Sequence, residues 1–324
     1  MAPQTRGTIE MAIAMIISGT VGWFVLTAGQ PAMTVVFWRC AFGALTMLIV
    51  CGLLGLLRRG IISRKQAGIA VLGGLALVFN WTLLFGAYAH VGAYAHASIA
   101  VATVVYHTQP FMLLGLGAIF FRETLTLNKI GWLLCAFSGI VLIVSAQAGA
   151  DGNDKSYLSG VLMALGAAFF YAVAAAITKK LSGIPPHVLV LIQLLVGVVI
   201  LAPFATMPVS PTASQWGMLV TIGVIHTGLM STLLYSAIQK IPTALVGALS
   251  FIYPVVAALV DWAAFGHRLD AMQLAGAVAI LLSAAGMTFG WRITFNRQER
   301  RLHQAVRSGE KQNASPPIEP NHPD

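Results

Sequence analysis

The chain has 324 residues, of which 58% are hydrophobic and only 9% are charged. Soluble domains contain roughly 45–50% apolar and about 25% charged residues, so this composition excludes a soluble globular protein and indicates an integral membrane protein. The net charge of +9 would favour nucleic acid as the partner of a soluble protein, but in a membrane protein the positions of the basic residues matter more than their sum. We therefore expect the lipid bilayer as a partner and no nucleic acid.

Windows of about 20 apolar residues predict an all-α integral membrane fold with ten transmembrane helices. In chain order the spans lie near residues 8–28, 32–57, 67–89, 97–121, 128–147, 157–178, 187–207, 215–238, 243–266 and 271–291. With the N-terminus inside, sixteen of the 19 Lys and Arg residues fall on the cytoplasmic side, two fall outside, and Arg39 lies within a span. The positive-inside rule then predicts a multi-pass protein of the cell (inner, cytoplasmic) membrane with both termini cytoplasmic.

The segment Ala93–Leu125 recurs 144 residues later as Ala237–Leu269, with Pro110 and Pro254 at matching places. Each half has five spans, an odd number, so the second copy enters the membrane in the opposite sense and the repeats are inverted. Secondary transporters use such repeats, and their sites lie where helices are interrupted. We expect both prolines to act as helix kinks or hinges. The predicted parts are a first five-helix repeat at 1–148, an external linker at 149–156, a second repeat at 157–291 and a disordered cytoplasmic tail at 292–324.

Polar side chains within spans are costly unless they face protein or a water-filled cavity, so each is a candidate for the site. The third, fourth, eighth and ninth spans carry most of them, and these spans form two pairs related by the repeat. We expect them to line one central cavity that binds a small molecule, with no metal ion and no cofactor; hydrogen bonding between helices without a ligand is the alternative for each residue alone. The candidate substrate-binding residues are Trp23, Asn80, Trp81, Thr103, Tyr106, His107, Gln109, His226, Thr227, Ser231, Tyr235, Ser250 and Tyr253.

Charged and titratable residues within the spans are few. Arg39 and Asp261 are predicted at similar depth near the outer side, which favours an ion pair that spares an isolated buried charge; an outer gate is the alternative. His107 and His226 lie deep in spans, where a neutral histidine hydrogen-bonds the substrate or a neighbouring helix. Because histidine titrates near physiological pH, coupling to protons stays open as an alternative.

A recognisable pattern surrounds the junction of the fourth and fifth spans: Pro110, Phe120–Leu127, Gly131 and Gly139, with Gly22, Trp23, Arg39 and the sixth span from Ala164 to Lys180. This pattern resembles the drug/metabolite transporter (DMT) superfamily, specifically its ten-helix EamA-type carriers. The resemblance covers roughly residues 8–291, and it implies alternating-access transport of small metabolites, often export of amino acids. One departure is His267, which stands where the second repeat would repeat Glu123.

We therefore predict a secondary-active membrane transporter that exports amino acids or related small metabolites, driven by the substrate gradient or by protons. An enzyme is not expected, because the chain carries no phosphate loop, no metal-ligand spacing and no nucleophile elbow. Two alternatives stay open: a multidrug or cationic-compound efflux carrier, and a non-transporting membrane partner or sensor protein. Both halves lie within one chain, so a monomer is sufficient and a dimer is left open.

Overall fold

The computed structural model describes residues 2–58, 60–92, 105–145, 155–207, 210–265 and 271–292. One unit, Met1–Gly290, contains all the helices of this described part, and residues 291–324 form a second unit. Of the predicted tail at 292–324, the structure describes only Arg292. The disorder predicted for the tail therefore stays a prediction.

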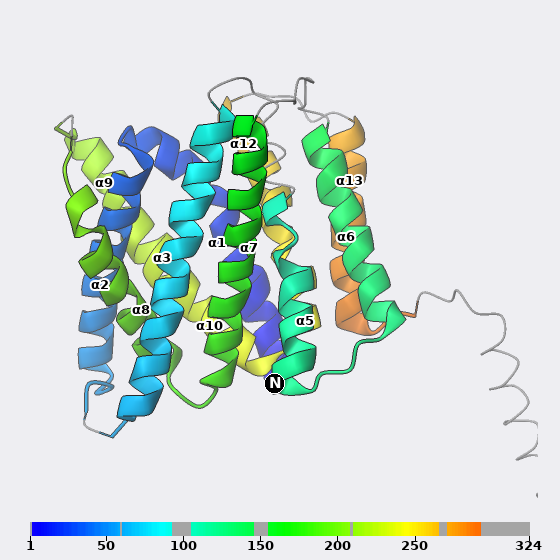
Figure 1. Ribbon diagram of the computed structural model, residues 1–324, viewed down its shortest axis with the longest axis horizontal. Coiled ribbons are helices and arrows are strands. Elements are labelled where there is room, and N and C mark those ends of the chain that lie inside the picture. The colour runs from blue at the N-terminus through cyan, green and yellow to red at the C-terminus, as the bar shows by residue number, and fades with distance from the viewer. Residues whose placement is uncertain are drawn as a thin grey trace, which may run out of the picture. The chain divides into compact units, whose positions relative to one another are not determined.

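Helices make up the regular structure of the described residues (Figure 1). The first half contains α1 (Pro3–Ala28), α2 (Ala32–Leu53), α3 (Arg64–Gly92), α5 (Gln109–Phe121) and α6 (Leu127–Ser145). The second half contains α7 (Lys155–Lys180), α8 (Pro186–Leu201), the short 3-10 helix η1 (Ala202–Phe204), α9 (Ala213–Thr221), the π-helix η2 (Ile222–Leu229), α10 (Met230–Lys240), α11 (Thr243–Ser250), α12 (Ile252–Phe265) and α13 (Ala271–Phe289).

Seven helical stretches of the described part are long and apolar enough to cross a membrane. Three shorter apolar helices, within α5, α6 and α13, occupy the remaining predicted spans. Three of the seven stretches are composite: α8 with η1 forms one, α9, η2 and α10 form the second, and α11 with most of α12 forms the third. The predicted all-α membrane fold with ten spans is confirmed.

Helix boundaries follow from residues that start or stop a helix. Pro186 begins α8 and Pro242 precedes α11, positions at which the missing N–H of proline breaks no helical hydrogen bond. Thr212 and Gln215 form a capping box at α9, in which Thr212 Oγ1 accepts from the Gln215 N–H at 3.3 Å and Gln215 Oε1 accepts from the Thr212 N–H at 2.9 Å. Gly29 ends α1 with a φ of +61°, which glycine adopts without steric cost.

The contacts between helices repeat when the two halves are exchanged. Helix α1 packs against α10 and α12, and its counterpart α7 packs against α3 and α5. The pairs α2 with α8 and α6 with α13 each join a helix to its own counterpart, and α5 packs against α11 where the fourth and ninth spans meet. This exchange is what two inverted five-helix repeats produce, and the expected duplication is confirmed.

Small residues allow the closest helix approaches. A Cβ added to Gly139 of α6 would lie 2.6 Å from the carbonyl oxygen of Gly276 in α13, so this pair of backbones meets directly. On α7, which packs against α3, Ala164, Ala168 and Ala172 are completely buried. Close backbone packing replaces the hydrophobic effect as the force between helices in lipid.

Candidate functional site

The fourth and ninth spans are both interrupted just before their prolines. A turn at Phe251 separates α11 from α12, three residues ahead of Pro254. A turn at His107 and the next residue precedes α5, whose second residue is Pro110. His107 and Phe251 are equivalent in the repeat, and their ring centroids lie 6.0 Å apart. The two breaks therefore meet where the repeats face each other.

The eighth span changes helix type where its polar residues lie. Helix η2 is a π-helix, and the Thr227 hydroxyl donates to the carbonyl of Ile222, five residues earlier, at 2.9 Å. Short π segments within α-helices frequently occur at functional sites. The polar residues of this span divide between two neighbours, because Thr227 contacts α2 while Tyr235 contacts α8.

Arg39 of α2 joins the eighth span to the third. Its Nε donates to Thr227 Oγ1 at 3.1 Å, and its guanidinium carbon lies 5.2 Å from the ring centroid of Trp81. A guanidinium over a Trp ring is a favourable cation–π contact. Among the described side chains, no carboxylate lies within salt-bridge distance of Arg39. The side chain of Asp261 lies outside the described residues, so the predicted ion pair or outer gate stays a prediction.

Asn80 of α3 joins the third span to the fourth and the sixth. Its side chain is 1% exposed, and Nδ2 donates to the Tyr106 hydroxyl at 3.3 Å and to the Ala167 carbonyl of α7 at 2.8 Å. The Tyr106 ring meets Tyr171 of α7 edge to face, with centroids 6.3 Å apart. A buried amide with two acceptors fixes the position of the Tyr106 hydroxyl.

The two deep histidines occupy different surroundings. His107 is completely buried and stacks on Tyr253 of α12, with ring centroids 5.2 Å apart and an interplanar angle of 20°. His226 lies against α1, where its Nε2 is 2.8 Å from Thr20 Oγ1 and its ring centroid is 4.7 Å from that of Phe24. Sequence reasoning did not select Thr20 or Phe24, although both flank the predicted Trp23.

Thr20 connects His226 to the backbone of α1. The Thr20 hydroxyl lies 2.8 Å from the Ile17 carbonyl, to which it can donate, and 2.8 Å from His226 Nε2. Which group donates in the second contact depends on the tautomer of His226. His226 thus links α1 and η2 through Thr20.

These contacts join most of the predicted site residues into one continuous polar and aromatic network. Three pairs of chain neighbours, at 80–81, 106–107 and 226–227, connect the individual contacts. We call it the central network: Thr20, Arg39, Asn80, Trp81, Tyr106, His107, His226, Thr227 and Tyr253. Its members come from both repeats, as expected for a site at the repeat interface.

Six predicted residues do not join the central network: Trp23, Thr103, Gln109, Ser231, Tyr235 and Ser250. Thr103 lies outside the described residues. Ser250 is buried, and its hydroxyl donates to a carbonyl of its own helix at 2.7 Å. Gln109 is buried, and Ser231 and Trp23 are half-buried. Their predicted part in substrate binding stays a prediction.

Tyr235 belongs to a separate contact that sequence reasoning missed in part. Its hydroxyl donates to Oε1 of Gln193 in α8, and both side chains are buried. Gln193 is the one amide within the apolar helix α8. This isolation within an apolar helix was the available signal for Gln193.

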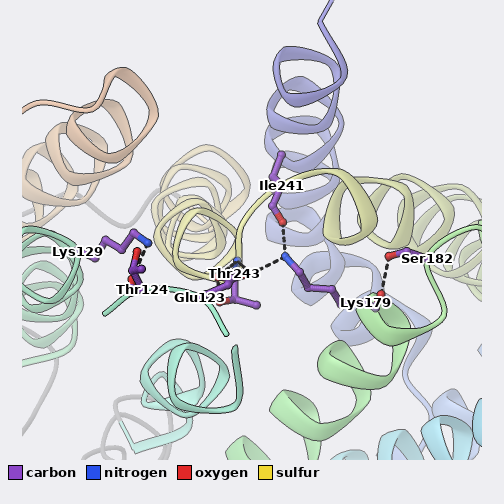
Figure 2. Close-up of polar contacts among 7 residues, drawn as sticks. All are labelled: Glu123, Thr124, Lys129, Lys179, Ser182, Ile241 and Thr243. Carbon is purple, nitrogen blue, oxygen red and sulfur yellow. Dashed lines mark hydrogen bonds and ion pairs between the residues drawn. The ribbon is translucent and has the colours of Figure 1, made fainter. Parts of the chain in front are cut away.

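A second cluster lies where α5 and α7 end and α11 begins, and we call it the end cluster (Figure 2). Arg122 ends α5 with a left-handed φ of +55°, which turns the chain so that Glu123 reaches α11. The Glu123 carboxylate accepts from Lys179 Nζ at 2.8 Å, from Thr243 Oγ1 at 2.6 Å and from the Thr243 N–H at 3.0 Å. Lys179 Nζ also donates to the Ile241 carbonyl at 2.7 Å. The end cluster, Glu123, Lys179, Ile241 and Thr243, therefore links both repeats.

The contacts of the end cluster keep Glu123 ionised at neutral pH. Burial raises the pKa of this carboxyl, but hydrogen bonds from Lys179 and Thr243 outweigh burial and hold the pKa below its ordinary value. The N-terminus of α11 adds a favourable partial positive charge. Sequence reasoning placed Glu123 in a family motif without assigning it to the site.

A neighbouring ion pair extends the same region to α1. Glu10 accepts from Lys240 Nζ at 2.7 and 2.6 Å and from Arg6 Nε at 2.8 Å. Lys240 is the last residue of α10. A Cβ added to Gly7 of α1 would lie 2.7 Å from Ile241 Cγ2, so the connection between α10 and α11 packs tightly on α1.

Comparisons with known proteins agree with this architecture. The profile of the EamA-like transporter family matches the chain twice, at residues 5–145 and 158–289. The chain is 30% identical over 284 residues to the uncharacterized transporter YxxF of Bacillus subtilis, covering 87% of this chain and 89% of that protein. A crystal structure matches with a TM-score of 0.78 at 19% identity, over 90% of this chain and 98% of the other, which shows the fold alone.

Two further relatives carry more specific names. One is a probable amino-acid metabolite efflux pump of Salmonella typhimurium, 25% identical over 207 residues and covering 60% of this chain and 68% of that protein. The other is the pseudopaline exporter CntI of Pseudomonas aeruginosa, 26% identical over 267 residues and covering 81% of this chain and 88% of that protein.

Proposed function

Because the chain belongs to the EamA-like transporter family of the DMT superfamily, we propose that it is a secondary-active exporter of amino acids or related small carboxylates. Transporters of this family span the bilayer many times and move small molecules, and they are not enzymes. The observation that carries the proposal is Arg39, which lies in the central network with no carboxylate partner among the described side chains. A carboxylate is the partner that a guanidinium binds best.

The surroundings of Arg39 favour a zwitterion over a simple anion or a cation. Tyr106 offers an aromatic ring whose electrons attract the ammonium group of an amino acid. Asn80 and Thr227 supply neutral hydrogen-bonding groups. None of the central network residues is acidic, so a cationic drug would meet the charge of Arg39 without a compensating carboxylate in that network. The cationic-compound alternative is therefore the weaker proposal.

The proposed transport mechanism is alternating access about the two helix breaks. Each break frees main-chain groups near the centre of a span, and short connections between half-helices can absorb a rotation. Pro110 and Pro254 keep each break in place because proline cannot restore the missing hydrogen bond. The turns at His107 and Phe251 are the proposed hinges between the half-helices.

The proposed location is the inner, cytoplasmic membrane with both termini in the cytoplasm, which the one-sided distribution of basic residues supports. Export then means movement away from the side that carries the end cluster. Fusion of a reporter that is active only in the cytoplasm to the C-terminus tests this orientation. A reporter that is active only outside the membrane would have to be silent at the same position.

Uptake into proteoliposomes tests the proposed function. The purified protein is reconstituted, and initial uptake of labelled neutral, acidic and basic amino acids and of a quaternary ammonium compound is measured with and without a pH gradient. Saturable uptake of one amino-acid class, absent from protein-free vesicles, is the expected result, and its response to the gradient decides proton coupling. Silence for every amino acid in tight vesicles, or uptake of the quaternary ammonium compound alone, would contradict the proposal.

A further inference from the structure

Charged side chains bind the connection between α10 and α11 to three other parts of the molecule, which are α1, α7 and the segment after α5. Lys240 is bound by Glu10 of α1, the Ile241 carbonyl by Lys179 of α7, and Thr243 by Glu123 after α5. Only Pro242 of these four consecutive residues has no such contact in the described part of the chain. Figure 2 shows how Lys179 bridges the Ile241 carbonyl and the Glu123 carboxylate.

Helix α11 links the connection after α10 to the break in the ninth span. It has eight residues, Thr243–Ser250, and all of them are buried. It packs against α5 and α1, and it ends at the turn of Phe251. A short helix that is held by ionic contacts at one end and ends at a turn at the other has the geometry of a gate.

We propose that Glu123 and Lys179, assisted by Glu10 and Lys240, form a latch that holds α11 in place and keeps this end of the transporter closed. The latch breaks and reforms in each transport cycle. This inference rests on the proposed function, since a gate has a role only in a transporter. Under the predicted topology the latched end faces the cytoplasm.

The exposure of the latch residues is suited to reversible opening. The side chains of Glu123 and Lys179 are 15% and 16% exposed, and that of Lys240 is 25% exposed. Water can therefore solvate these groups as soon as they separate, which a fully buried ion pair would not allow without a desolvated charge. The pairs thus hold the closed state without making it permanent.

The latch has no direct equivalent of Glu123 in the second repeat. The residue at the equivalent position is His267, which has no carboxylate. Because the repeats are inverted, this position belongs to the opposite end of the bundle. We therefore assign the ionic latch to the end that carries Glu123.

Distances between spin labels test the latch without any substrate. Labels are placed on the α6 start and the turn after α7 through Leu127→Cys and Ser182→Cys, both exposed in the structure. The native cysteines are first replaced by alanine at Cys40, Cys51 and Cys135. Distance distributions are then compared between the parent and the variants Glu123→Gln, Lys179→Met and their combination.

Lys129→Met is the matched control, because the Lys129 ammonium donates to the Thr124 carbonyl at 2.7 Å rather than to a member of the end cluster (Figure 2). We expect Glu123→Gln and Lys179→Met to raise the ratio of long-distance to short-distance molecules about tenfold, as loss of a hydrogen bond to a charged group predicts. Lys129→Met leaves the ratio unchanged. The shift in the double variant is smaller than the sum of the two single shifts, because the two residues share the contact between Glu123 and Lys179.

Three results would overturn the latch: unchanged distributions in both single variants, an equal shift in Lys129→Met, or additive shifts in the double variant. Each protein must elute as a single species on gel filtration. If Glu123→Gln fails to fold, Thr243→Val replaces it as the test variant, because it keeps both charges and loses one hydrogen bond. The smaller shift expected from Thr243→Val supports the latch, and its absence contradicts it. Latch opening in a protein that transports no amino acid would refute the proposed substrate and leave the gate intact.

Discussion

The central network and the end cluster use opposite kinds of contact. In the central network, neutral hydrogen bonds and ring contacts surround one arginine that has no carboxylate partner among the described side chains. In the end cluster and at Glu10, each carboxylate binds a lysine. A neutral hydrogen bond contributes less than one between charged groups, so a ligand can replace contacts of the first kind more readily than contacts of the second. The comparison supports our proposal that binding and closure depend on different residues.

The largest expected effect on transport comes from a substitution in the central network. Arg39→Ala should reduce the initial rate of uptake about tenfold to hundredfold, because the substrate carboxylate loses a hydrogen bond to a charged group. Arg39→Lys keeps the charge but loses the planar fork, and it should retain part of the activity. The melting temperature reports whether either protein is damaged. Full activity in a folded Arg39→Ala protein would remove Arg39 from the site.

The next largest effect is expected on stability, at the place where α11 of the ninth span packs against α5 of the fourth span. A Cβ at Gly247 of α11 would lie 2.9 Å from Pro110 Cβ, so Gly247→Ala should destabilise the protein by about 1–3 kcal/mol through overpacking. Gly115→Ala, on α5 with no heavy atom within 4 Å of its added Cβ, is the matched control and should stabilise its helix slightly. Thermal unfolding measures both. Equal effects of the two substitutions would contradict the close crossing.

Melting temperatures measured over a series of pH values separate the contribution of the end cluster to stability from that of the central network. The folded protein holds the pKa of Glu123 below its ordinary value of 4.5, so the stabilisation is complete above that value and is lost as the pH falls through the folded pKa. Glu123→Gln lacks this titration. The melting temperature of the parent should therefore exceed that of Glu123→Gln at neutral pH, and the difference should shrink in acid. A difference that is the same at both pH values would show that Glu123 acts through packing alone.

The smallest effects are expected at Glu10, whose partners are more exposed. Lys240→Met should cost about 0.2–1 kcal/mol of stability and Arg6→Met less, since exposed ion pairs are weakened by water and salt. The side chain of Arg6 is 68% exposed and that of Lys240 is 25% exposed. Thermal unfolding at low and high salt measures both. A larger loss from Arg6→Met than from Lys240→Met would reverse the assigned order.

Sequence reasoning succeeded where a local pattern decides the structure. The repeat around Pro110 and Pro254 predicted the inverted halves, and the structure interrupts both spans just before these prolines. Polar residues in apolar spans identified most of the central network, because a polar side chain in lipid needs a protein partner. Neither argument needed a long-range contact.

It failed where the partners are distant in the chain. Glu123 binds Thr243, which is 120 residues away, and nothing local to Glu123 distinguishes this role from that of a surface acid. Thr20 binds His226 across 206 residues in the same way. The π-helix at Ile222–Leu229 has no compositional signal, because its residues suit an ordinary apolar helix. Such features depend on how the two repeats pack.

The most direct test of the division between binding and closure is the rise in melting temperature that the transported compound causes. A ligand that binds only the folded protein raises its stability in proportion to the logarithm of its concentration relative to Kd. The rise should be present in the parent and in Glu123→Gln and absent in Arg39→Ala. An equal rise in Arg39→Ala, or its loss in Glu123→Gln, would contradict the assignment of binding to the central network and closure to the end cluster.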